Sequence, residues 1–71
     1  MKTNTVSFKS SVLRSASYVA SKRALLVTFH SGVQYMYLGV PSDVVKEFVA
    51  SHSVGSYFAK YIKGTYESEQ V

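Results

Sequence analysis

The chain has 71 residues and no cysteine, and its eight Lys and Arg against four Asp and Glu give a formal net charge of +4. This length supports a single domain, and the lack of cysteine excludes disulfides and thiolate ligands. No apolar run approaches the ~20 residues of a membrane span, and the N-terminus lacks a signal-peptide pattern. We therefore expect a cytoplasmic protein with no membrane partner.

The charges are unevenly distributed along the chain. Glu67 and Glu69 lie in segment 67–71, which lacks apolar periodicity, so we expect a frayed acidic tail there. The rest of the chain has eight cations against Asp43 and Glu47, a formal +6. This imbalance favours an acidic partner, nucleic acid above all, although a basic surface can also serve solubility alone.

Three strands are predicted in the first half of the chain. Residues 10–20 alternate weakly, with Val12, Ala16 and Tyr18 on one face and Leu13 on the other, and predict a first strand. Segments 24–29 and 33–38 are rich in β-branched and aromatic residues and predict a hairpin. Residues 1–9 are expected to form a partly ordered N-terminal extension.

The apolar pattern selects the length of the hairpin loop. A two-residue loop would place Tyr35 and Tyr37 on the face opposite Val27, whereas a three-residue loop over 30–32 places all apolar residues together. We therefore predict the three-residue loop, with Gly32 in the left-handed conformation. Its apolar face would contain Leu25, Val27, Phe29, Val33, Tyr35 and Tyr37. The other face carries Leu26, Met36 and Leu38, a candidate protein interface if no helix covers it.

Two short helices are predicted in the second half. Pro41 and Asp43 suit the start of a helix over 41–50, whose apolar face contains Val44, Val45, Phe48 and Val49. Ser53 is a natural N-cap for a second helix and Gly64 a natural C-cap. The apolar stripe of this helix comprises Tyr57, Phe58, Tyr61 and Ile62. The predicted fold is α+β: a three-stranded antiparallel β-meander followed by two helices packed on one face (β-β-β-α-α).

An ordered set of motifs runs through residues 10–66. It consists of an early Ser and a Tyr, then Leu-x-Val-x-Phe, Gly, Tyr-x-Tyr, Val-Pro, Ser-x-Gly-x-Tyr-Phe and Ile-Lys-Gly-x-Tyr. The residues concerned are Ser11, Tyr18, Leu25, Val27, Phe29, Gly32, Tyr35, Tyr37, Val40, Pro41, Ser53, Gly55, Tyr57, Phe58, Ile62, Lys63, Gly64 and Tyr66. This set resembles the KTSC domain, a module named for its occurrence at the C-terminus of some lysyl-tRNA synthetases.

The resemblance implies a single KTSC-like domain over residues 10–66. The family also occurs as short standalone proteins in bacteria and phages, so a phage-encoded member would act in the host cytoplasm. This chain has Ala59 where the family often has Asn, and Lys63 where it often has Arg. Lys and Arg are not equivalent at planar or bidentate sites. The association with a tRNA synthetase suggests RNA as a partner.

The residues needed for catalysis or metal binding are scarce. A metal site would have to combine His30, His52, Asp43 and Glu47, which lie in different elements and are too few for a closed zinc site. Ser53 follows His52 directly, but sequence neighbours rarely point at each other, and a cap explains Ser53 better. No phosphate loop occurs. We expect no enzyme, no cofactor and no small-molecule substrate.

Two kinds of binding remain as hypotheses. Cations and aromatic residues interleave in the second helix, as in proteins that bind single-stranded nucleic acid. The candidate residues are Lys60, Tyr61, Lys63 and Tyr66, with Arg14, Lys22 and Arg23 as an extension. Tyrosines at helical spacing are, however, more often part of a core. The alternative is protein binding or self-association, through Leu26, Met36 and Leu38 or through an open strand edge.

Overall fold

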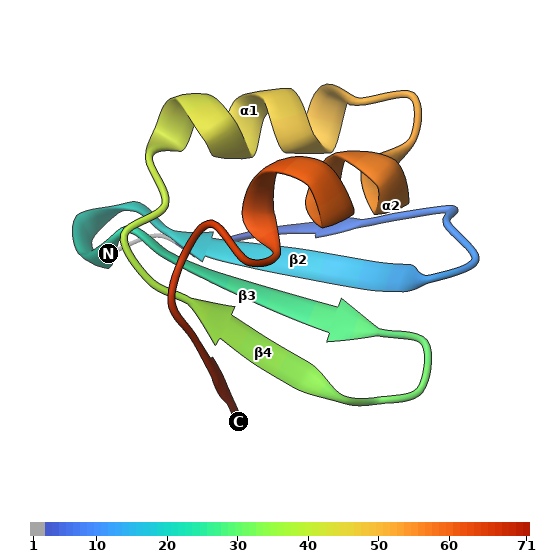
Figure 1. Cartoon of the computed structure of the whole chain (residues 1–71), viewed down its shortest axis with the longest axis horizontal. Coiled ribbons are helices and arrows are strands. Elements are labelled where there is room, and N and C mark those ends of the chain that lie inside the picture. The colour runs from blue at the N-terminus through green and yellow to red at the C-terminus, as the bar shows by residue number, and fades with distance from the viewer. Residues whose placement is uncertain (1–2) are drawn as a thin grey trace.

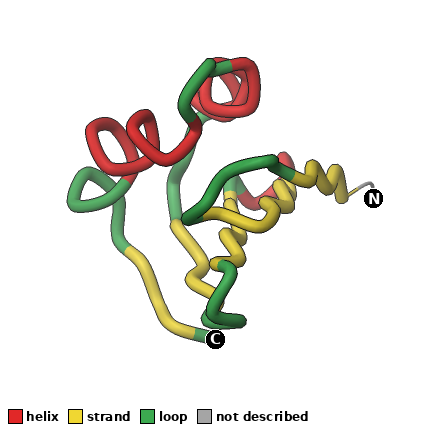
Figure 2. The backbone as a smooth tube through the Cα atoms, turned by 90° about the vertical axis from the view of Figure 1, so that its right-hand side faces the viewer, coloured by secondary structure: helices red, strands yellow, loops and turns green. Residues whose placement is uncertain are grey.

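The computed structural model describes residues 3–71, and side chains from residue 5 onward. Five antiparallel strands form one sheet in the order β1-β2-β3-β4-β5, and two helices lie together on one of its faces (Figure 1). Figure 2 shows the helices and the strands as two separate layers. The strands are β1 (Thr3–Ser7), β2 (Leu13–Val19), β3 (Ala24–Phe29), β4 (Gln34–Tyr37) and β5 (Ser68–Gln70), and the helical segments are η1 (Ala20–Lys22), α1 (Ser42–Ala50), α2 (Val54–Tyr57) and η2 (Phe58–Ile62).

The sheet confirms the predicted class but corrects the number of strands from three to five. The residues expected to fray at 67–71 contain β5, which pairs with β4 and places Glu69 opposite Met36. The expected N-terminal extension contains β1, which pairs with β2. Both outer strands are mostly polar and show no apolar alternation in the sequence. Backbone hydrogen bonds, rather than buried side chains, hold them in the sheet. One example is the 2.9 Å bond from Leu38 N to Glu67 O.

The three-residue hairpin loop between β3 and β4 is confirmed. Leu25 lies opposite Tyr37, and Val27 lies opposite Tyr35. Phe29 N donates to Val33 O at 2.9 Å, which closes the hairpin at the predicted pair. Gly32 has a φ of +93°, the left-handed conformation that the loop was expected to require.

A β-bulge in β2 corrects the predicted faces of the first strand. The register between β2 and β3 shifts between Leu13 and Ser15, so that Arg14 is the extra residue. The bulge rotates the strand end, and Leu13 becomes fully buried with Ala16 while Val12 is 51% exposed. Simple alternation predicts the reverse for Leu13 and Val12, because an inserted residue changes which face each side chain occupies.

The core lies between the sheet and the two helices. Phe48 of α1 is fully buried, and its ring lies 5.3 Å from Phe8 and 6.4 Å from Phe58, centroid to centroid. Pro41 is the N-cap of α1, with a φ of −69° and an extended ψ of 153°, so the helix begins at Ser42, one residue later than predicted. Within residues 3–71, no helix is both long enough and apolar enough to cross a bilayer.

Candidate nucleic-acid interface

The second helix begins at a side-chain N-cap and changes from α-helix to π-helix after Tyr57. Ser53 Oγ accepts a hydrogen bond from Ser56 N at 3.4 Å, which confirms the predicted N-cap. Lys63 N donates to Phe58 O at 2.8 Å, so η2 is a π-helical turn rather than an α-helical one. Gly64 follows this turn with a φ of +81°. Such wide turns are rare and occur frequently at functional sites.

Tyr61 is the aromatic residue of this turn that faces solvent. Phe58 and Ile62 point into the core, whereas Tyr61 is 55% exposed. The sequence prediction placed Tyr61 in the apolar stripe because it assumed 3.6 residues per turn. In the structure Phe58 and Ile62 fill the core position, and Tyr61 lies beside Tyr57 at the surface.

Tyr61 is supported by a second tyrosine. Its ring centroid lies 4.7 Å from that of half-buried Tyr57, at an interplanar angle of 45°. Tyr57 Oη donates to Glu47 Oε1 at 3.4 Å. Burial raises the pKa of Tyr57, and the nearby Glu47 carboxylate raises it further. Tyr57 therefore remains a neutral donor that is held by α1, while the Tyr61 ring is available to a ligand.

Lys63 lies at a hollow lined by aromatic residues. The hollow has a volume of about 450 Å³, and Phe29, Tyr35, Tyr37 and Phe58 form its apolar wall. The rings meet edge to face, with 6.0 Å between Phe29 and Tyr35 and 5.4 Å between Tyr37 and Phe58. Burial raises the pKa of Tyr37, and a hydrogen bond with Ser68 opposes this rise. The hollow thus combines flat apolar surface with a single cation.

The structure brings together only some of the predicted cations. Lys60 and Lys63 are exposed on and just after η2. Lys22 and Arg23 lie at η1, before β3, whereas Lys63 lines the aromatic hollow, whose lining includes neither of them. Arg14 is exposed at the bulge of β2, toward the opposite end of that strand from Lys22.

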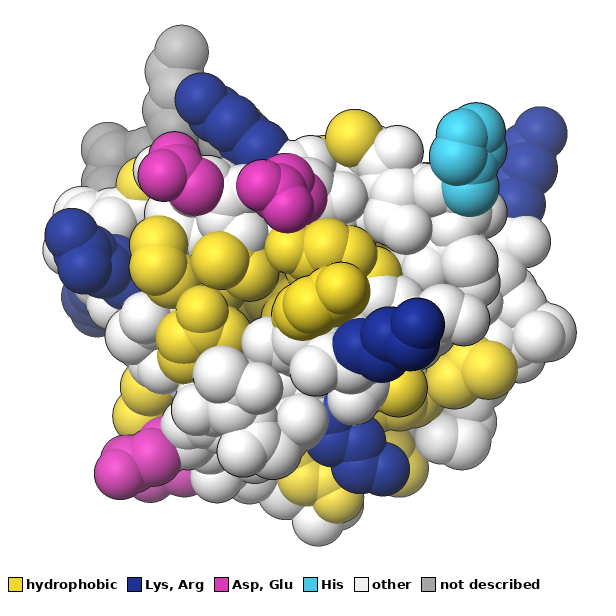
Figure 3. Space-filling model, turned by 45° about the horizontal axis from the view of Figure 1, so that its top comes forward, with side chains coloured by type: hydrophobic (Ala, Val, Ile, Leu, Met, Phe, Trp, Pro, Cys, Tyr) yellow, Lys and Arg dark blue, Asp and Glu magenta, His cyan; other side chains and the backbone are white. Residues whose placement is uncertain are grey.

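Aromatic and charged groups share the helix side of the molecule. Figure 3 shows apolar side chains at the centre of this face, two acidic side chains along the upper margin and two cations below and to the right. The exposed acids of α1 are Asp43 and Glu47. Tyr66 is half-buried and packs against the core. The lysines on the η2 side of this face would attract a polyanion, whereas α1 carries Asp43 and Glu47 beside a single cation, Lys46.

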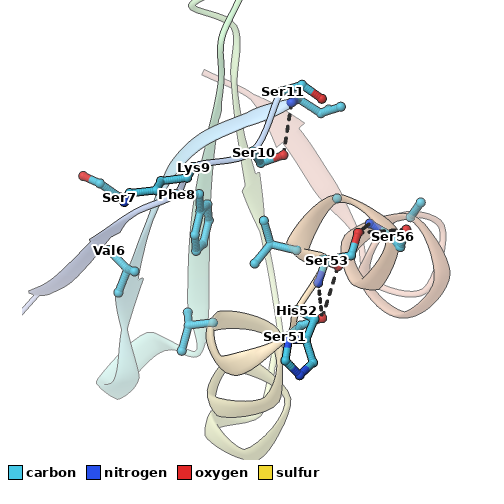
Figure 4. Close-up of a pocket in the computed structure, with 15 residues that line it drawn as sticks. Val6, Ser7, Phe8, Lys9, Ser10, Ser11, Ser51, His52, Ser53 and Ser56 are labelled. Atoms are coloured by element: carbon cyan, nitrogen blue, oxygen red, sulfur yellow. Dashed lines mark hydrogen bonds between the residues drawn. The ribbon is translucent and has the colours of Figure 1, made fainter.

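A larger hollow separates the β1–β2 connection from the α1–α2 connection. Its volume is about 720 Å³, and Figure 4 shows Phe8 pointing into it, with Ser10 and Ser53 on the same side of the ring. The Ser53 hydroxyl donates to Ser56 Oγ at 3.1 Å, so its bonds explain it as part of a cap. Gly55 also lines this hollow. His30 is not part of the lining, but its Nε2 lies 2.6 Å from the carbonyl oxygen of Ser10, which is.

The candidate protein interface lies on the sheet face without helices. Leu26 and Met36 are cross-strand neighbours there, and both are half-buried. Leu38, which follows β4, is 38% exposed. Ser17 flanks Leu26, and Glu69 flanks Met36. The apolar surface on this face is therefore small and bordered by polar residues.

Sequence reasoning missed the aromatic wall beside Lys63. Phe29, Tyr35 and Tyr37 were correctly assigned to one sheet face, but their proximity to Lys63 depends on how η2 packs over β4. The only sign of this wall in the sequence is that the Leu-x-Val-x-Phe and Tyr-x-Tyr motifs place their aromatic residues on the same face of the sheet. Among residues 3–71, no three His, Asp or Glu side chains come close enough to hold a metal ion.

Comparisons with known proteins identify the family. The KTSC domain model matches residues 9–66. The chain is 36% identical over 61 residues to a lysine–tRNA ligase of Nostoc punctiforme, covering 86% of this chain and 11% of the ligase. It is 38% identical over 58 residues to an uncharacterized protein of Stutzerimonas stutzeri, covering 82% of each. This chain thus spans about a tenth of the length of the curated ligases that it matches.

A solved structure extends the similarity to the outer strands. The crystal structure of a KTSC domain protein from Yersinia pestis has a TM-score of 0.90 and 30% sequence identity, and the match covers 99% of each chain. β1 and β5 lie outside the 9–66 family match, yet this structural match includes them. The motifs, the fold and the comparisons agree, and the chain belongs to the KTSC domain family.

Proposed function

We propose that this protein is a non-catalytic module that binds single-stranded RNA through the surface formed by Lys60, Tyr61 and Lys63. The observation that supports the proposal most is the exposure of the Tyr61 ring on η2, with Lys60 and Lys63 nearby in the sequence. Single-stranded nucleic acids are bound by cations that contact phosphates and by aromatic faces on which bases stack.

The aromatic hollow supports the same function. An unstacked base has room beside Phe29 and Tyr35, and Lys63 at the same hollow would meet the adjoining phosphate. Stacking contributes about 1–3 kcal/mol per base. RNA is favoured over DNA because similar sequences occur within lysine–tRNA ligases, whose name includes tRNA as a substrate.

A protein partner is less favoured by the geometry. The surface formed by Leu26, Met36 and Leu38 is interrupted by Glu69, and two of its three residues are half-buried. An interface of that kind would need a larger continuous apolar area. A protein partner remains the alternative if nucleic acid does not bind.

Fluorescence anisotropy with labelled single-stranded RNA, single-stranded DNA and tRNA across a salt series tests the proposal. We expect log K to fall with log salt at a slope of about −0.7 per phosphate contacted. The double variant Lys60→Glu/Lys63→Glu should bind RNA at least about tenfold more weakly, since it replaces attraction by repulsion at the contact.

The matched control is Lys22→Glu/Arg23→Glu, which makes the same change in net charge at residues that do not line the aromatic hollow. At physiological salt the Debye length is about 8 Å, so we expect this change to weaken RNA binding less than the change at Lys60 and Lys63. An equal loss of RNA affinity in both double variants would show that net charge, rather than the η2 surface, causes the loss. Affinity that does not depend on salt, or no RNA binding at low salt, would refute the proposal.

A further inference from the structure

The two edges of the sheet are built differently. β5 has three residues with Glu69 at its centre, and short length and charge are two devices that protect an edge from pairing. β1 has five residues, none charged and none proline, and its register with β2 runs without a break from Thr3 to Ser7. β1 thus lacks the devices that protect β5.

The hydrogen bond from Phe8 to Arg14 shows which backbone groups of β1 are free. Phe8 N donates to Arg14 O at 2.9 Å, so these residues form a hydrogen-bonded pair. Hydrogen-bonded and non-bonded pairs alternate along an antiparallel ladder, so Val6 also bonds to β2. The N–H and C=O groups of Thr5 and Ser7 therefore point away from the sheet, toward the position of a further strand.

The helix side of β1 is also incompletely covered. Val6 lies opposite buried Ala16 and is 36% exposed. A hollow of about 250 Å³ lies between Val6 and the α1 residues Val45 and Val49, and most of its lining is apolar. A strand added beside β1 would continue the sheet past this hollow and shield Val6 from water.

We propose that the added strand is β1 of a second copy, paired antiparallel about a two-fold axis at Thr5. In this register Thr5 faces Thr5 of the other copy, Ser7 faces Thr3, and every outward backbone group from Thr3 to Ser7 has a partner. An axis perpendicular to the sheet keeps both helix layers on the same side, and it makes the two Val6 side chains diagonal neighbours on that side.

The second copy is favoured because the edge is compatible with itself. A two-fold contact brings each residue close to its own equivalent, and an uncharged strand meets no like charge across the axis. A chain of this size also buries only about 60% of its unfolded surface alone, so pairing adds burial that the monomer lacks. The contact is smaller than a standard interface of about 1,600 Å², so the dimer should be weak.

Sedimentation equilibrium between about 10 µM and 1 mM protein tests this dimer, a range that detects weak association of about −7 to −4 kcal/mol. Wild type should shift from monomer to dimer across the range. Thr5→Pro should remain monomeric, because it removes an N–H that points away from β2 and keeps the β1–β2 ladder; proline is tolerated at such edge positions.

Gln70→Pro is the matched control at the other edge. Leu38 N bonds to Glu67 O, and Val71 N bonds to Gln34 O, so by alternation Gln70 also points its N–H outward. This variant should dimerise like wild type. Val6→Lys is a second disrupting variant that needs no change of backbone, and it should be monomeric because it adds like charges across the axis.

Circular dichroism of each variant establishes that it is folded. A wild-type monomer throughout the range would overturn the proposal. Dimerisation of folded Thr5→Pro and Val6→Lys at wild-type affinity would overturn it as well, since the contact would then lie elsewhere on the molecule.

Discussion

At the scale of single residues, Tyr18 shows how one buried polar atom fixes the corner between the sheet and α1. Its hydroxyl donates to Val40 O at 2.6 Å, and both residues are buried. Val40 N donates in turn to Arg23 O at 2.9 Å. Both backbone groups of Val40 are thereby satisfied immediately before Pro41, where the chain leaves the sheet and enters the helix.

Tyr18→Phe should destabilise the fold without changing its shape. The substitution leaves Val40 O buried without a partner, which costs about 1–3 kcal/mol. The measurement is urea unfolding followed by circular dichroism. Tyr61→Phe removes a hydroxyl at an exposed position and should change stability by less than about 0.5 kcal/mol. Equal effects of the two substitutions would show that the Tyr18–Val40 bond contributes no net stability.

At the scale of elements, the second helix is followed by one glycine that the backbone requires, Gly64, and contains one that it does not require, Gly55. Gly64 has a φ of +81° after η2, and an added Cβ would meet no atom within 4 Å. Its requirement for glycine is therefore conformational rather than steric. Gly55 lies within α2 without a positive φ, and an added Cβ would make an ordinary contact with Ser10 Oγ at 3.7 Å.

Replacing each glycine by alanine should change stability with opposite signs. Gly64→Ala should lower the free energy of unfolding by about 1 kcal/mol, because a left-handed conformation is costly for a residue with a Cβ. Gly55→Ala should raise it by about 0.5–1 kcal/mol through helix propensity. Chemical unfolding of the two variants in parallel checks the pair. Destabilisation by Gly55→Ala would show that the hollow beside Ser10 has no room for a methyl group.

At the scale of the whole molecule, the sheet extends beyond the segments that the apolar pattern reveals. Val71 N donates to Gln34 O at 3.0 Å, so β5 is held to β4 as far as the last residue. Ser68 also lines the aromatic hollow beside Lys63. The C-terminal segment therefore supports both the sheet and the candidate RNA surface.

Deleting residues 68–71 should destabilise the protein by about 1–2 kcal/mol, because it removes the backbone bonds of β5 and exposes the edge of β4. Thermal and urea unfolding of the truncated chain measure this loss. A frayed tail, as the sequence alone suggests, would leave stability unchanged within about 0.5 kcal/mol. That outcome would contradict the five-stranded sheet.

The sequence predicts the parts of this fold that bury apolar side chains. The alternation around Val27 and Tyr35 identifies the hairpin and its loop, and Ser53 identifies the start of the second helix. β1 and β5 escape prediction because backbone pairing leaves no apolar pattern. The bulge at Arg14 and the wide turn at Phe58 escape it because each inserts a residue into a regular period. The sequence placed Tyr61 both in the apolar stripe and among the candidate binding residues, and its exposure needed the structure.

The most direct test of the RNA-binding surface is a titration of the ¹⁵N-labelled protein with single-stranded RNA, followed by amide chemical shifts. We expect the largest changes at Lys60, Tyr61 and Lys63 and around the hollow at Phe29 and Tyr35, with none at Lys22 and Arg23. Changes confined to the β1 edge or to the sheet face of Leu26, or no changes at all, would contradict the proposal.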